Sequence, residues 1–223
     1  MGLCVSLLVK GSRKDNNTET VVGPLSHSYE AIIQNADSPL DVSSKEKLYE
    51  KLYSGVFLHH RQQKYWIDEA GRNYFTLLAR GLLICWGENN EYWSWETYTE
   101  QDGAEAEMAR LKRVCFFHVK GKLEIKLLSP GTKYEIVYII MLEDDAQGWE
   151  IPISVEFRFQ GEVYKRNLSL MSRPRGQWIE LQFGEFHTSY DLLGDVYFSM
   201  SGNEGLEWKS GFLVKGVSIR PKT

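Results

Sequence analysis

The chain of 223 residues is predicted to fold as an all-β protein, an antiparallel jelly-roll-like β-sandwich with one or two short helices and a disordered N-terminal extension. Three observations favour this class. Short apolar segments that alternate with polar residues recur from Lys64 onward, which is the period-two pattern of half-buried strands. Glycines separate many of these segments, as turns require. Aromatic residues make up 13% of the chain, and large aromatic side chains suit pleated sheets.

Residues 1–40 are expected to form a flexible extension, because small polar residues dominate this part and show little periodicity. The first residues lack the basic start of a signal peptide, so the protein is expected to be cytoplasmic and not secreted. They do fit the pattern for N-myristoylation at Gly2, with Cys4 available for a second acyl chain. The alternatives are a membrane tether through this acylated terminus and an unmodified tail.

Residues 41–63 are expected to form a short helical lead-in to the sandwich. A helix is predicted over 43–53, where Ser43 and Glu46 have the spacing of a capping box. Leucines and tyrosines four residues apart would share one face of this helix. Gly55 is a suitable residue to end it.

Residues 64–223 are expected to form the sandwich. One further helix is predicted near Ala104 to Arg113, with Met108 and Leu111 on its apolar face. The expected strands are Tyr74–Ala79, Leu82–Trp86, Tyr92–Thr97, Cys115–Val119, Leu123–Leu128, Tyr134–Leu142, Ile153–Phe159, Glu162–Asn167, Trp178–Phe183, Val196–Met200 and Phe212–Ile219.

Composition excludes several function classes. A net charge of -4 argues against a dedicated nucleic-acid binder. The three cysteines, Cys4, Cys85 and Cys115, are widely spaced and form no disulfide framework or zinc motif. No histidine pair or nucleophile motif indicates catalysis, so neither an enzyme nor a metal or other cofactor is expected.

The segment from Ile84 to Trp95 carries the strongest functional signal. It holds three tryptophans and a tyrosine around a polar turn that contains Glu88 and Asn89. An indole face can stack on the C–H face of a pyranose ring, while carboxylates and amides bind the hydroxyl groups at the ring edge. The pattern therefore favours carbohydrate binding.

A hairpin in this segment would bring two of the tryptophans together. Trp86 and Trp93 are predicted to be exposed at the mouth of the hairpin, whereas Trp95, deeper in the strand, is predicted to lie in the core. Base stacking on the same aromatic groups is the alternative, and short basic runs at 110–113 and 173–175 keep an RNA-binding interpretation open.

Ordered sequence blocks from about residue 64 to 221 resemble the plant phloem protein 2 (Nictaba-like) family of lectins. The matching blocks are Leu77–Gly87, Tyr92–Trp95, Leu111–Gly121, Leu128–Tyr134, Trp178–Phe186, Trp208–Gly211 and Val214–Pro221. The resemblance implies a non-catalytic, metal-free jelly-roll sandwich that often forms homodimers. It implies binding of N-acetylglucosamine oligomers, chitin fragments or N-glycan cores, with a role in phloem or in stress and defence signalling. An RNA- or protein-binding module of phloem transport is the alternative.

The resemblance also implies site residues. It places sugar contacts on Trp86 and Trp93, and an acidic contact on Asp195. A second acidic position of the family pattern is occupied by Gly202 in this chain, and Glu204 is the nearest acidic substitute.

Overall fold

The computed structural model describes residues 28–100 and 103–222. Gly2 and Cys4, where acylation is predicted, lie outside the described residues. Within the described part, no helix is both long enough and apolar enough to cross a membrane. The elements in chain order are α1 (Tyr29–Asn35), α2 (Lys45–Ser54), β1 (Val56–Leu58), β2 (Gln63–Ile67), β3 (Asn73–Leu78), η1 (Ala79–Gly81), β4 (Leu83–Ile84), β5 (Trp93–Thr99), β6 (Glu105–Leu111), β7 (Phe117–Glu124), η2 (Ile125–Leu127), β8 (Lys133–Leu142), β9 (Ile153–Phe159), β10 (Glu162–Leu168), β11 (Ile179–His187), β12 (Asp195–Gly202), η3 (Glu204–Leu206) and β13 (Phe212–Pro221).

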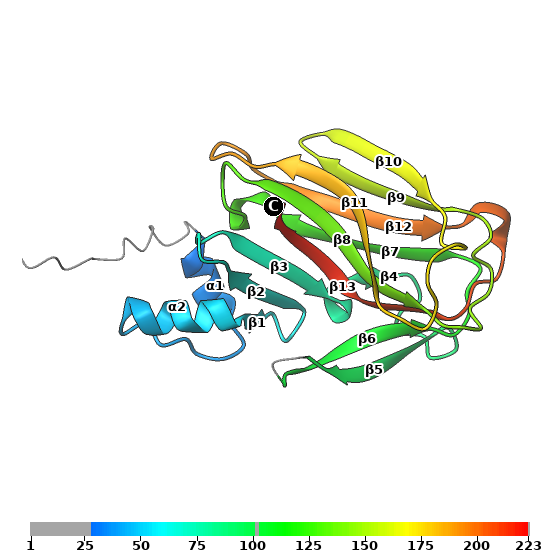
Figure 1. Ribbon diagram of the computed structural model, residues 1–223, viewed down its shortest axis with the longest axis horizontal. Coiled ribbons are helices and arrows are strands. Elements are labelled where there is room, and N and C mark those ends of the chain that lie inside the picture. Colours follow the sequence, from blue (N-terminus) through cyan, green and yellow to red (C-terminus); the bar gives the residue numbers. More distant parts are fainter. Residues whose placement is uncertain (1–27, 101–102, 223) are drawn as a thin grey trace, which may run out of the picture.

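The strands form two antiparallel sheets that pack as a sandwich, which confirms the predicted fold class (Figure 1). The larger sheet has the order β1-β2-β3-β13-β6-β5, and β8 and β11 extend it from the other edge of β13. The smaller sheet has the order β10-β9-β12-β7-β4. Alternation places Val196, Phe198 and Met200 of β12 in the core, while Tyr197 faces outward.

The larger sheet divides where β13 changes partners. Leu213 and Val214 pair with β6, whereas the stretch from Gly216 to Ile219 pairs with β3, and a bulge lies between the two parts. Gly216 permits this close approach, because a Cβ atom there would stand 2.2 Å from the carbonyl oxygen of Leu77. The β5–β6 hairpin consequently diverges from β2 and β3 (Figure 1).

The predicted helix near 104–113 is wrong, because most of this segment is strand β6. The residues Glu105–Leu111 are good helix formers, with two alanines, two glutamates, a methionine, an arginine and a leucine. The segment nevertheless pairs with β5 along its whole length. Cross-strand pairing with the aromatic strand therefore outweighs intrinsic helix propensity.

The N-terminal region also differs from expectation. Helix α1 lies within residues expected to be disordered, and Ile32 anchors it in the core. Helix α2 is capped by Ser44 rather than Ser43: the Ser44 hydroxyl oxygen accepts a hydrogen bond from the Lys47 amide at 3.3 Å. Gly55 ends α2 as predicted, with a φ of 92°.

The observed strands differ from the predicted ones in three places. Strands β1 and β2 were not predicted, although β2 places Tyr65 and Ile67 in the core. The two expected strands Cys115–Val119 and Leu123–Leu128 form one strand, β7, which ends at Glu124, after which the chain turns into η2. The remaining predicted strands are present: Ile153–Phe159 has its predicted ends, and the ends of the others are shifted.

Stability is predicted to fall steeply at alkaline pH, because three tyrosines are buried as neutral phenols. Tyr65 donates to the Asn73 side chain, Tyr134 donates to the Asn73 carbonyl, and Tyr138 donates to the Val119 carbonyl. Burial raises the pKa of all three, that of Tyr134 to about 12. Above pH 10, roughly the pKa of an unfolded tyrosine, the unfolded state loses protons that the folded state keeps, so the free energy of unfolding falls.

Each of these tyrosines should contribute a slope of about -1.4 kcal/mol per pH unit between pH 10 and its own folded pKa. Urea unfolding at a series of pH values measures this slope, and near-ultraviolet tyrosinate absorbance follows the protonation of the folded protein. Complete ionisation of every tyrosine near pH 10 in the folded chain would contradict the prediction.

Candidate functional site

A turn between β4 and β5, which we call the Trp86 turn (residues 85–92), presents the aromatic segment. The Cys85 amide donates to the His118 carbonyl of β7 at 2.9 Å and fixes the start of the turn to the smaller sheet. The Asn89 amide donates to the Trp86 carbonyl at 2.9 Å. The Asn89 side-chain oxygen accepts from the Glu91 amide at 2.8 Å, so that oxygen already shapes the turn.

Trp86 is exposed, as predicted, with 58% of its surface accessible. Its backbone has a φ of 61°, a left-handed conformation that is unfavourable for a large non-glycine residue. The indole meets the Tyr92 ring edge-on, with ring centroids 6.1 Å apart. The turn thus holds a large apolar ring in solvent and in a strained backbone position, a combination that indicates a functional rather than a packing role.

Trp93 is buried, so the prediction of an exposed Trp93 is wrong. Only 1% of its surface is accessible. Its indole stacks on Phe117 at a centroid distance of 6.4 Å and donates to the Cys85 carbonyl at 3.1 Å. Trp93 therefore supports the Trp86 turn from the core and offers no face to a ligand.

Trp95 is only half-buried, which corrects its predicted place in the core. Its indole donates to the Gly87 carbonyl at 3.0 Å, and the guanidinium of Arg80 lies 3.6 Å from its ring centroid. Arg80 also pairs with Glu107 at 2.8 Å and approaches Glu88 at 3.5 Å. Glu88 stays largely exposed, so its carboxylate is accessible beside Trp86.

A second exposed indole, Trp208, was not predicted as a site residue. It is 52% accessible, and the guanidinium of Arg113 covers its ring at 4.6 Å. The Arg113 amide donates to the Tyr92 carbonyl, so Trp208 lies at the same end of the sandwich as the Trp86 turn. No local sequence pattern marks it, because alternation would place the charged Lys209 in solvent and Trp208 in the core, and the structure shows the reverse.

Asp195, the acidic contact that the family resemblance implies, lies far from Trp86. Asp195 pairs in register with Glu124, whereas Gly202 pairs with Phe117 next to the Trp86 turn. Asp195 and Gly202 are seven positions apart on β12, a separation of about 23 Å along a strand. The Trp86 and Asp195 side chains therefore cannot bind the same sugar ring.

The Asp195 carboxylate is already engaged within the protein. It accepts hydrogen bonds from Lys122 Nζ at 2.8 Å and from the Tyr197 hydroxyl at 3.1 Å. The hydrogen bond from Lys122 holds the pKa of Asp195 below its usual value. Asp195 thus orients Tyr197.

The Gly202 position faces inward rather than toward a ligand. A Cβ atom there would stand 3.0 Å from Cε of the buried Lys209, so an acidic side chain would point at this lysine. The Nζ of Lys209 donates to the Glu207 carbonyl at 3.3 Å, and burial lowers the pKa of Lys209. The backbone of Glu204 begins η3, at the Gly202 end of β12.

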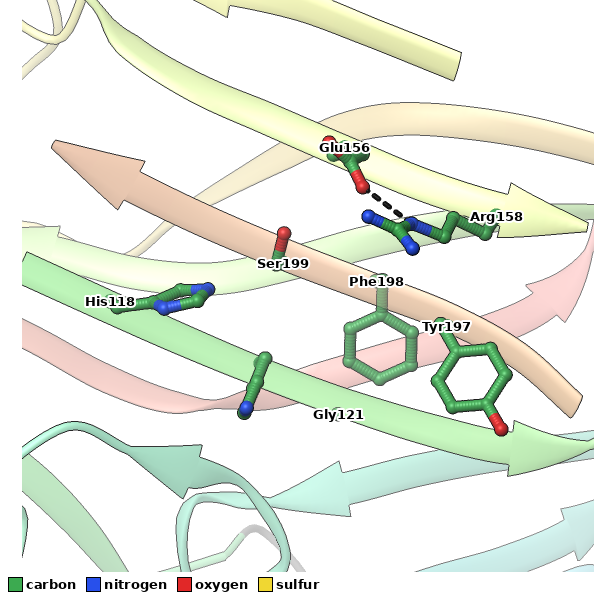
Figure 2. A pocket seen from close by; sticks show the side chains of 8 residues that line it. His118, Gly121, Glu156, Arg158, Tyr197, Phe198 and Ser199 are labelled. Carbon is green, nitrogen blue, oxygen red and sulfur yellow. Dashed lines mark hydrogen bonds and ion pairs between the residues drawn. The ribbon is translucent and has the colours of Figure 1, made fainter. Parts of the chain in front are cut away.

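A groove of about 370 Å³ opens on the outer face of the smaller sheet, and we call it the His118 groove. His118, Ser199 and Glu156 lie toward one end, and Tyr197 and Arg158 toward the other (Figure 2). Its lining residues are His118, Lys120, Gly121, Glu156, Arg158, Tyr197, Phe198 and Ser199.

The walls of the His118 groove are mostly apolar, and its charged side chains are two cations, Lys120 and Arg158, and one carboxylate, Glu156. Arg158 pairs with Glu156 at 2.7 Å (Figure 2). Burial lowers the pKa of His118, so its imidazole is neutral at neutral pH and offers one donor and one acceptor. Because the Cys85 amide bonds to the His118 carbonyl, the groove begins beside the Trp86 turn. Among the described residues, no cluster of histidine, cysteine or acidic side chains could hold a metal ion.

Comparison with known proteins identifies relatives of the chain. The family model for phloem protein 2 matches residues 72–221. A phloem protein 2-like A1 protein of Arabidopsis thaliana is 39% identical, over 91% of this chain and 83% of its own length. A lectin of Luffa acutangula is 38% identical, over 88% of this chain and 94% of its own length. These matches confirm the resemblance in the sequence and the prediction of a binding protein rather than an enzyme.

Solved structures give a weaker likeness. A xylan-binding domain of Paenibacillus barcinonensis resembles 65% of this chain and 87% of its own, at 16% identity and a TM-score of 0.38. A similarity of this size supports no conclusion about a ligand.

Proposed function

Because the chain belongs to the phloem protein 2 family, we propose that it is a carbohydrate-binding protein whose site combines the Trp86 turn and the adjoining His118 groove. A lectin among its relatives supports this function. The observation that carries the proposal is the exposed indole of Trp86, held in a left-handed turn beside an open groove with mostly apolar walls.

The site would use two kinds of contact. One pyranose ring stacks on Trp86, and the exposed Glu88 accepts hydrogen bonds from hydroxyls at the ring edge. Further sugar units lie along the His118 groove, where the neutral His118 and the Ser199 hydroxyl can both donate and accept. Tyr197, which is oriented by Asp195, would bound the end of the His118 groove that is farther from Trp86.

The proposed ligands are N-acetylglucosamine oligomers, chitin fragments or N-glycan cores on glycoproteins. Mostly apolar walls suit the C–H faces of an uncharged sugar, and a neutral imidazole offers the one donor and one acceptor that its acetamido group needs. We further propose a cytoplasmic protein of phloem or of stress and defence responses. Homodimers would raise avidity if one glycan spans both sites, and acylation at Gly2 and Cys4 would add a membrane tether.

Titration calorimetry with N-acetylglucosamine oligomers of increasing length tests this function. The affinity should rise with each added unit until the groove is filled, and it should change less than about twofold between low and moderate salt. RNA binding, the alternative, would weaken steeply over the same range, because phosphate contacts release counterions. Absence of binding by every oligomer, or a steep salt dependence, would contradict the proposal.

A further inference from the structure

A second open groove lies on the outer face of the larger sheet. It forms where the β5–β6 hairpin diverges from β2 and β3, and its volume of about 620 Å³ exceeds that of the His118 groove. The end of α2 contributes a further wall. We call it the Trp66 groove, after the first of the residues that define it: Trp66, Tyr74, Thr76, Tyr98, Lys215 and Ser218.

Aromatic rings form one side of the Trp66 groove. Trp66 and Tyr74 are cross-strand partners, and their rings stack at 5.3 Å with an interplanar angle of 25°. Both side chains are only half-buried. Tyr53, from the end of α2, adds a third and exposed ring to the same groove. Such a ridge can stack against the C–H face of a sugar.

Small side chains with hydroxyl groups form the floor of the Trp66 groove. Thr76 and Ser218 are direct partners on β3 and β13, and they face outward because their neighbours Phe75 and Leu77 point into the core. They are nevertheless only 9% and 3% accessible. The longer side chains around them therefore rise above a recessed, hydrogen-bonding floor.

Two of the three cations that line the groove are paired with carboxylates. Lys64 lies 3.8 Å from Glu100, and Arg220 forms a two-contact ion pair with Glu180, at 2.6 Å and 2.9 Å. Because most of its charges are already paired, the groove favours a neutral ligand over a phosphate or an acidic group.

Lys215, the third cation that lines the groove, lies between two aromatic rings. Lys215 Nζ lies 4.4 Å from the Tyr98 ring centroid and 4.3 Å from that of Trp178. Burial lowers the pKa of Lys215. These contacts tie the diverging β5 strand to β13 and so hold the wall of the groove in place.

We propose that the Trp66 groove is a second carbohydrate site, which takes a neutral oligosaccharide by stacking on Trp66 and Tyr74 and by hydrogen bonding to Thr76 and Ser218. The groove lies on the outer face of one sheet, and the His118 groove lies on the outer face of the other. A single chain can therefore bridge two glycans without forming a dimer. This inference goes beyond the proposed function, which needs only the site at Trp86.

An array of neutral oligosaccharides (chito-, cello-, xylo-, manno- and galacto-oligomers) tests the second site. The Trp86→Asn variant removes the first platform and should keep binding at least one member of the array. Adding Trp66→Ala, or separately Thr76→Val, should weaken that residual binding at least tenfold. Thr76→Val keeps the side-chain shape and removes only the hydroxyl at the floor, so a loss of binding in this variant does not come from a change in packing.

The outcomes separate the two sites. If Trp86→Asn abolishes all binding, or if the residual binding survives both Trp66→Ala and Thr76→Val, the second site is overturned while the first stands. If Trp86→Asn changes nothing and Trp66→Ala removes all binding, the second site stands and the first is overturned. A proline-rich peptide is the control ligand, because such peptides also dock in aromatic grooves. Its binding in place of every sugar, with the same sensitivity to Trp66→Ala, would also overturn the proposal.

Discussion

Replacing Trp93 with alanine is expected to lower the free energy of unfolding by about 4 kcal/mol. The indole is almost fully buried, stacks on Phe117 and donates to the Cys85 carbonyl. Its removal leaves a cavity in the core and an unpaired carbonyl at the start of the Trp86 turn. Urea unfolding followed by far-ultraviolet circular dichroism measures the change, and the melting temperature should fall by about 10 °C.

Trp95→Ala is the matched control for the Trp93 variant, because both indoles lie on β5 and both donate to the Trp86 turn. Trp95 is only half-buried, so its loss should destabilise the fold by a smaller amount. Equal effects of the two substitutions, or a loss below about 1 kcal/mol for Trp93→Ala, would mean that Trp93 is not a core residue.

Replacing Trp86 with asparagine is expected to lower the affinity for sugar strongly and to change the stability of the fold little. Affinity for N-acetylglucosamine oligomers should fall about 30-fold, which corresponds to about 2 kcal/mol for the loss of an aromatic anchor. The free energy of unfolding should stay within about 1 kcal/mol of the parent value. Asparagine tolerates the left-handed backbone that Trp86 adopts, and this relief offsets the lost contact with Tyr92.

Trp86→Tyr is the control for the binding role of residue 86, since it keeps an aromatic face at the same position. It should retain most of the affinity that Trp86→Asn loses. Unchanged affinity in a folded Trp86→Asn chain would remove Trp86 from the site. A large loss of stability would instead make Trp86 a packing residue.

The period-two pattern was sufficient to predict most of the sandwich, because most of these strands bury one face; β10 is an exception, since none of its residues is buried. The pattern failed for β6, where strong helix formers adopt a strand because they pair with the neighbouring strand β5 and with β13 from the far end of the chain. The pattern also could not distinguish the buried Trp93 from the half-buried Trp95, because the two side chains share a face of β5. The difference between them depends on where the β5–β6 hairpin leaves the sandwich, since Trp93 stacks on Phe117 and Arg80 covers Trp95.

The candidate site was predicted only as far as local sequence could place it. The turn around Trp86, with Glu88 exposed beside it, follows from residues that are close in sequence. The far position of Asp195 and the proximity of His118 depend on the register between β4, β7 and β12, which no local pattern reveals. The place of Glu156 and Arg158 beside Tyr197 and Ser199 likewise depends on the pairing of β9 with β12.

The indole N–H signals in a two-dimensional NMR spectrum test the central claim most directly, because they report Trp86 and Trp93 separately within one titration. Signals assigned with the Trp86→Tyr and Trp93→Phe variants would be followed as a chitin oligomer is added. We expect the Trp86 signal to shift until the protein is saturated, while the Trp93 signal moves little. A titration that saturates with the Trp86 signal unmoved would contradict the account.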